Sequence, residues 1–105
     1  MQTRTVEDVV VLDLGNVKVP SGQTSTFAKT VEESFFANKI VFDGTFNAKG
    51  IHFNLYVDRG DTSKSFPIWS SLDLQVGDVF RVEIINQSEE IFATSIRLFG
   101  RPKCS

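Results

Sequence analysis

The chain has 105 residues, with 11 Lys and Arg against 13 Asp and Glu and a formal net charge of −2. This is the usual size of one domain, and such a domain buries enough surface to fold without disulfides or structural metals. The two signs of charge are interleaved along the chain, which argues against a nucleic-acid binder or a membrane-surface protein. The longest apolar run, Val9 to Leu12, is far below the roughly 20 residues that cross a bilayer.

The two ends of the chain are predicted to lie outside the domain. Residues 1–8 are polar and are expected to form a tail, or an arm that docks on a neighbouring subunit. They hold no apolar stretch of signal-peptide length, so we expect a protein made in a cytoplasm. Residues 101–105 are expected to be a solvated tail. Cys104 is the only cysteine, which excludes an internal disulfide, and an idle thiol is expected there.

The first half of the chain predicts short strands separated by turn formers. Residues 10–14 alternate and predict a strand that ends at Gly15-Asn16, with an extension over residues 17–19. Two further strands are expected over residues 23–31 and 39–43. Between them, residues 31–37 allow at most one helical turn, because seven residues are too few to hold a helix without strong packing.

The clearest strand covers residues 51–58, where apolar and polar side chains alternate strictly. Residues 63–71 give a weaker strand, because Pro67 cannot donate a ladder hydrogen bond and so marks an edge strand or a bulge. Residues 70–76 are expected to form a connection. Residues 80–85 and 92–98 alternate again, and the short polar stretch between them predicts a hairpin of antiparallel neighbours.

These elements amount to seven or eight short strands with no crossover helix. The pattern predicts an all-β fold over residues 9–100, an antiparallel Greek-key or jelly-roll β-sandwich. A five-stranded barrel fits the number of strands less well.

No arrangement of residues predicts catalysis or a cofactor. His52 is the only histidine, and neither a Gly-x-Ser-x-Gly elbow nor a nucleotide-binding glycine loop is present. Asp58, Asp61 and Thr62 offer oxygen atoms, but they lack the regular spacing of a dedicated calcium loop. We therefore expect a protein that is not an enzyme and has no metal site.

Several residues are candidates for a partner or ligand surface. Arg59-Gly60-Asp61 resembles the adhesion tripeptide that integrins recognise, but the expected explanation is a simple turn in which Gly60 supplies a positive φ. Asn86-Gln87-Ser88 matches the N-glycosylation pattern and is most simply a turn. Tyr56, Phe66 and Trp69 are placed where a carbohydrate-binding module has its stacking aromatics, and core or inter-subunit packing explains them at least as well.

An apolar surplus also predicts a partner surface. Ile85, Ile91, Phe99 and Val41 fall on the face opposite the better core set of their strands. A neighbouring subunit would cover such side chains, and alternatively both faces of a central strand are buried.

Three segments together resemble small single jelly-roll or β-sandwich structural proteins of bacteriophage virions. They are Val19-Pro20-Ser21-Gly22-Gln23-Thr24-Ser25-Thr26-Phe27, residues 36–42 followed by Gly50-Ile51-His52-Phe53, and residues 74–88 with the closing Ile96-Arg97-Leu98-Phe99-Gly100. The resemblance implies a capsid or capsid-decoration component of a virion, made in the host cytoplasm. Its implied partners are other virion proteins and further copies in a homo-oligomer. The alternative is a carbohydrate- or receptor-binding sandwich such as a fibre head, with a glycan as partner.

Overall fold

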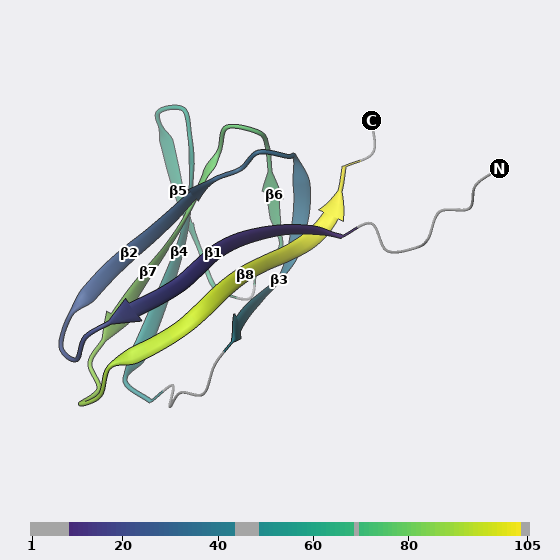
Figure 1. The fold of residues 1–105 in the computed structure, drawn as a ribbon. Coiled ribbons are helices and arrows are strands. Elements are labelled where there is room, and N and C mark those ends of the chain that lie inside the picture. Colours follow the sequence, from purple (N-terminus) through teal and green to yellow (C-terminus); the bar gives the residue numbers. More distant parts are fainter. Residues whose placement is uncertain (1–8, 44–48, 69, 104–105) are drawn as a thin grey trace.

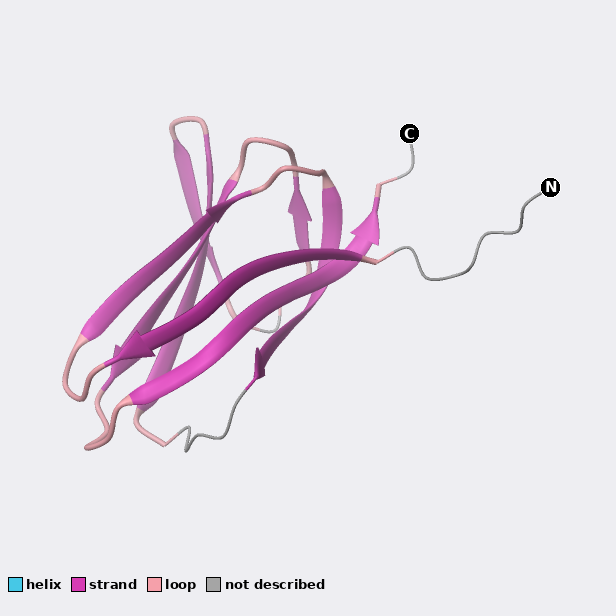
Figure 2. Ribbon diagram, in the orientation of Figure 1, coloured by secondary structure: helices cyan, strands magenta, loops and turns pink. Residues whose placement is uncertain are grey.

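A computed structural model describes residues 9–43, 49–68 and 70–103 of the chain. These residues form eight strands and no helix (Figures 1 and 2). The strands are β1 (Val10–Val19), β2 (Thr24–Thr30), β3 (Phe35–Asp43), β4 (Ile51–Arg59), β5 (Thr62–Phe66), β6 (Leu72–Leu74), β7 (Val79–Asn86) and β8 (Phe92–Pro102).

The strands form two four-stranded antiparallel sheets, in the orders β1-β8-β3-β6 and β2-β7-β4-β5. Figure 1 shows the sheets as two layers, with β1 and β8 in the front layer and β2, β7 and β4 behind them. The fold is therefore the all-β sandwich that the alternating pattern predicts.

Successive strands mostly change sheet. β4 and β5 are the one pair of consecutive strands that hydrogen-bond to each other in the described part of the chain. The predicted hairpin of residues 80–85 and 92–98 is therefore wrong, because β7 pairs with β2 and β4 whereas β8 pairs with β1 and β3. The turn-like residues between them cross from one sheet to the other, a role that local sequence does not distinguish from a hairpin loop.

Four other elements differ from the expectation. Residues 10–19 form one strand, because the break expected at Gly15-Asn16 is a β-bulge between Asp13 and Gly15. Residues 35–37 are strand and not helix, since Phe35 and Ala37 point into the core with Phe36 outward. Three residues of the expected 70–76 connection form β6 beside them. β8 runs four residues past the predicted strand end at residue 98, to Pro102, and so includes the first two residues of the expected C-terminal tail.

The core lies between the sheets and is built from the inward residues of each strand. β7 shows this best, because Phe80, Val82 and Ile84 are fully buried while the residues between them are half-buried. Burying one such side chain contributes roughly 1.5–3 kcal/mol to the hydrophobic term. The largest fully buried apolar side chains are Phe35, Phe80, Phe92, Leu55, Leu74, Ile84 and Ile96.

β5 and β6 are the edge strands on one side of the sandwich. β5 ends at Phe66, directly before Pro67, which confirms the prediction of an edge strand there. β6 pairs only with residues 35–37 of β3. As a result, the two sheets are unequal at this side, and cavities open between them.

Candidate functional site

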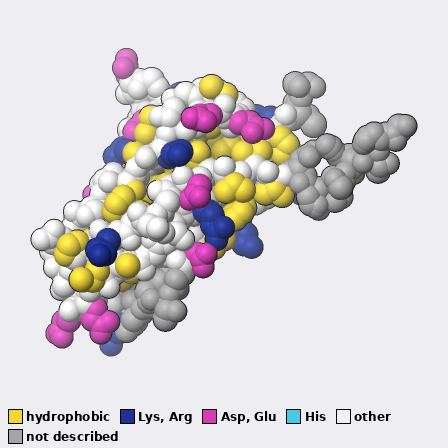
Figure 3. Space-filling view, viewed as in Figure 1, with side chains coloured by type: hydrophobic (Ala, Val, Ile, Leu, Met, Phe, Trp, Pro, Cys, Tyr) yellow, Lys and Arg dark blue, Asp and Glu magenta, His cyan; other side chains and the backbone are white. Residues whose placement is uncertain are grey.

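The outer face of the β1-β8-β3-β6 sheet carries apolar side chains in outward positions. Val11 of β1 lies opposite Phe99 of β8, and Val41 of β3 lies opposite Arg97. Val11 is 46% exposed and Phe36 is 50% exposed, while Val41 and Phe99 are half-buried. We call Val11, Phe36, Val41 and Phe99 the apolar outer face. Figure 3, in the orientation of Figure 1, shows hydrophobic side chains in several groups on the visible surface, with charged side chains among them.

Charged side chains border the apolar outer face. Arg97 forms an ion pair with Asp43 at 2.8 Å, and its guanidinium lies 5.8 Å from the centre of the Phe99 ring. Lys103 pairs with Asp73, and its ammonium lies 5.1 Å from the centre of the Phe36 ring. Cations at this distance are attracted to aromatic rings, so they hold the two phenylalanines in place while leaving Phe36 half exposed.

The outer face of the other sheet is polar and internally bonded. Tyr56 points outward, as the alternation predicts, and its hydroxyl donates to Glu83 Oε1 at 3.3 Å. Asn54 donates to the same oxygen at 2.9 Å. Arg81 lies 4.6 Å from the centre of the Tyr56 ring and donates two hydrogen bonds, of 2.6 and 2.9 Å, to Asp58.

These contacts shift two pKa values on the polar face. Partial burial, followed by the Glu83 carboxylate, raises the pKa of Tyr56. Hydrogen bonds from Arg81 and then from Ser63 lower the pKa of Asp58. At neutral pH the face therefore holds a protonated phenol beside paired carboxylates, and its polar groups largely satisfy one another.

Arg59 of the Arg59-Gly60-Asp61 tripeptide has a structural partner. Its guanidinium donates to both carboxylate oxygens of Asp78, at 2.9 and 2.8 Å, and to the carbonyl of Asp73 at 3.1 Å. The Asp78 side chain is 2% exposed, and it also accepts from the backbone N–H of Gln75 at 2.8 Å. The Arg59 side chain thus fastens the β4–β5 hairpin to the β6–β7 turn, while Asp61 is exposed at the hairpin tip.

Replacing Asp78 with alanine is expected to lower the free energy of unfolding by about 2 kcal/mol at pH 7. The change leaves the Arg59 guanidinium and the Gln75 N–H without their acceptor, and the 48% exposure of Arg59 keeps the loss below that of a fully buried pair. The Arg59 hydrogen bond lowers the pKa of Asp78, so its contribution is complete above about pH 4 and is lost as the pH falls through the folded pKa. Urea unfolding at pH 7 and at about pH 2.5 measures both values.

Asp61→Ala is the control, because Asp61 lies in the same hairpin and is exposed. A change within about 0.5 kcal/mol is expected for it at either pH. A deficit of Asp78→Ala that is as large in acid as at neutral pH would contradict the ion-pair explanation.

The remaining predicted site residues do not form one surface. Ile85 is half-buried on the polar face between Thr24 and His52, whereas Phe99 belongs to the opposite sheet. Ile91 is 60% exposed in the connection before β8. Trp69 and Cys104 lie outside the described residues, as does the predicted arm of residues 1–8.

In the glycosylation-like sequence Asn86-Gln87-Ser88, the acceptor asparagine is buried while Gln87 is exposed. Asn86 is 1% exposed, and its amide donates to the carbonyls of Val19 and Glu90 at 2.9 and 2.8 Å. The side chain oxygen accepts from both the backbone and the hydroxyl of Ser88. A side chain held in this way is not accessible to a glycosylating enzyme in the folded protein.

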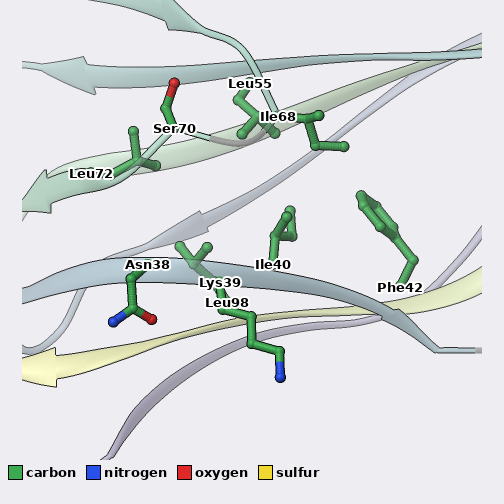
Figure 4. A pocket seen from close by; sticks show the side chains of 9 residues that line it. All are labelled: Asn38, Lys39, Ile40, Phe42, Leu55, Ile68, Ser70, Leu72 and Leu98. Carbon is green, nitrogen blue, oxygen red and sulfur yellow. The ribbon is translucent and has the colours of Figure 1, made fainter.

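Two cavities open on the β5–β6 side of the sandwich. The first has a volume of about 400 Å³, and Figure 4 shows Ile40 and Phe42 of β3 facing Ile68 and Leu55 across it, with Lys39 pointing away. The second, of about 470 Å³, lies between the β4–β5 hairpin and β6. Leu72 of β6 lines both.

Sequence reasoning did not single out Arg81, Glu83, Asp78 or Arg97. The alternation of apolar and polar residues placed Arg81, Glu83 and Arg97 on outer faces, and the sequence indicated nothing more about their contacts. The side chains that pair with them lie at least 19 residues away in the chain, so these pairs depend on strand register and on contacts between loops.

No group of three or more His, Cys, Asp or Glu side chains suited to a metal occurs in the described ranges. Nor do these ranges hold a helix long and apolar enough to cross a membrane. No family model, no curated protein and no solved structure matches this chain. The outer faces and the cavities are therefore the evidence on which a function rests.

Proposed function

We propose that this protein is a non-enzymatic structural component of a virion, capsid-associated or decorating the capsid, which acts by assembling with copies of itself and with other virion proteins. The observation that carries the proposal is the apolar outer face on the β1-β8-β3-β6 sheet. The fold adds support without deciding the function, since one fold hosts many functions.

The strand order supports the virion part of the proposal. The two sheets have the orders β1-β8-β3-β6 and β2-β7-β4-β5, and all but one of the seven connections pass between them. Eight antiparallel strands wound into two sheets in this way have the plan of a jelly roll, an architecture that recurs in viral capsid proteins and also in lectins. This order is the basis on which we infer the jelly roll.

The apolar outer face supports self-association. Val11 and Phe36 expose about half of their surface in the single chain, and Phe99 lies between Val11 and Lys39. Exposed apolar side chains grouped on a sheet face and rimmed by polar residues are typical of protein–protein interfaces. A second copy of the chain packed on this face would bury these side chains away from water.

The charges around this face suit a copy of the same chain. Both signs are present, with Asp13 and Asp43 on either side of Arg97, and Lys39 beside Phe99. In a two-fold contact each patch meets its own copy, so a face that carries both signs is able to pair with itself. A face of one sign would repel its copy.

Light scattering of the purified chain over a range of concentrations tests this proposal. The wild-type protein is expected to form an oligomer, and Val11→Asp to weaken self-association roughly tenfold or more, because it buries an unpaired carboxylate in the interface. Electron microscopy of concentrated wild-type protein is expected to show closed or lattice-like assemblies.

Ile91→Asp is the matched control, because Ile91 is also an exposed apolar residue and lies away from the apolar outer face. It is expected to keep the wild-type mass, and circular dichroism verifies that both variants fold. A wild-type chain that stays monomeric at every concentration, or equal behaviour of the two variants, would sink the proposal.

The alternative of a carbohydrate- or receptor-binding module has weaker support. Of the aromatics that this hypothesis uses, Phe66 packs against the core, and Tyr56 has Arg81 over one side of its ring. Asn54 and Glu83 form hydrogen bonds within the same network. A sugar would have to displace contacts that are already made. A glycan array is the appropriate next experiment if light scattering finds only a monomer.

A further inference from the structure

The cavity between the β4–β5 hairpin and β6 combines an apolar wall with cationic groups. Val57, Phe66 and Leu72 supply the apolar wall, and Arg59 and Lys64 supply the cations. Its volume of about 470 Å³ is within the range of small-molecule sites. The cavity exists because β6, across from the hairpin, has only three residues and leaves part of the inner face of β5 uncovered.

Lys64 occupies an inward position of the sheet. It lies opposite Val57 in the hairpin, while its neighbours Ser63 and Ser65 lie opposite Asp58 and Tyr56 of the outer face. An inward lysine on an edge strand also prevents that edge from pairing with another sheet, and this protection is the alternative explanation for Lys64. Among the described residues Lys64 has no ion-pair partner.

The other charges of the cavity are already balanced. Arg59 is neutralised by Asp78, and Asp73 is paired with Lys103, so Lys64 remains as the uncompensated charge. Arg59 uses Nε and one amino group for Asp78 and Asp73, which leaves its second amino group without a hydrogen bond in the described part of the chain. Two cationic donors at an apolar wall fit one carboxylate attached to a hydrocarbon body.

We propose that this cavity binds a small apolar carboxylate. The carboxylate accepts hydrogen bonds from Lys64 and from the free amino group of Arg59, and its hydrocarbon body packs against Val57, Phe66 and Leu72. The proposal is independent of assembly, because the apolar outer face lies on the opposite surface of the β6-containing sheet.

An NMR titration of the full chain with phenylacetate tests the site, with phenylacetamide as the uncharged isostere. Phenylacetate is expected to shift the amide signals of Val57, Phe66 and Leu72 in a saturable way, and phenylacetamide to bind about tenfold more weakly because it lacks the charge-assisted hydrogen bonds. Lys64→Gln is expected to weaken phenylacetate about tenfold and to leave phenylacetamide unchanged.

Lys29→Gln is the matched control, since Lys29 is an exposed lysine of β2, on the other edge of the sheet. It is expected to bind both compounds like the wild type. The proposal is overturned if the shifts do not saturate, if acid and amide bind equally, or if the two lysine variants behave alike. An absence of binding would leave Lys64 with its edge-protecting role alone.

Discussion

Replacing Gly100 with alanine is expected to lower the free energy of unfolding by about 3 kcal/mol or more, because the added methyl group would overlap the backbone of the neighbouring strand. Gly100 is an inward residue of β8, opposite Ala37 of β3. A Cβ built there meets the backbone carbonyl of Phe36, and it comes within 2.7 Å of the Ala37 Cα. Backbone atoms of a paired strand have no rotamer with which to move aside, so the two strands would have to separate.

The close approach belongs to the β-bulge in β3, where the register with β8 shifts between Ala37 and Lys39. Urea unfolding measures the loss, with Gly60→Ala as the control. Gly60 has a φ of +58°, and a Cβ added there would meet no neighbouring atom. Gly60→Ala is therefore expected to lower the free energy of unfolding by only about 1 kcal/mol, the cost of a left-handed backbone conformation. A loss at Gly100 no greater than that at Gly60 would refute the steric explanation.

Replacing Asn86 with alanine is expected to lower the free energy of unfolding by about 3 kcal/mol. Its side-chain amide donates hydrogen bonds to the carbonyls of Val19 and Glu90, and its side-chain oxygen accepts hydrogen bonds from Ser88. The substitution therefore leaves polar groups at the end of the core without these partners. Asn86→Asp is expected to cost still more at neutral pH, because a carboxylate would then face two carbonyl oxygens.

Thermal or urea unfolding checks this, and the loss in Asn86→Asp should shrink in acid, where the carboxyl group regains a proton that it can donate. Asn54→Ala is the control, since Asn54 makes one hydrogen bond, to Glu83, on a half-exposed face. Its expected loss is below about 1 kcal/mol. Equal losses at the two positions would show that the buried network adds nothing.

Alternation was enough to place most side chains relative to the core. It put Tyr56 and Phe99 on outer faces, and Leu55 and Leu98 inside, because a strand reverses side at every residue. The apolar surplus at Val41 and Phe99 was therefore visible in the sequence. That these two residues share a surface with Val11 and not with Ile85 was not visible, because it depends on which sheet each strand joins.

The parts that could not be predicted depend on contacts between distant residues. The polar stretch after Asn86 has the composition of a hairpin loop. Hydrogen bonds to distant residues hold it in the crossing between the sheets, among them those from Asn86 to Val19, from Ser21 to Ser88 and from Gln87 to Gly50. Three residues are too few for β6 to show a period. The role of Arg59 was hidden for the same reason, since its partner Asp78 lies 19 residues away.

The position of β8 has a consequence for the order in which the protein can be made. β8 follows the other seven described strands in sequence, yet it lies in the interior of its sheet, between β1 and β3. Until Pro102 has left the ribosome, β1 and β3 have nothing between them and the apolar side chains of both remain open to water. The β1-β8-β3-β6 sheet therefore cannot form until β8 has been synthesised, and during that interval the exposed apolar side chains make the chain prone to aggregation.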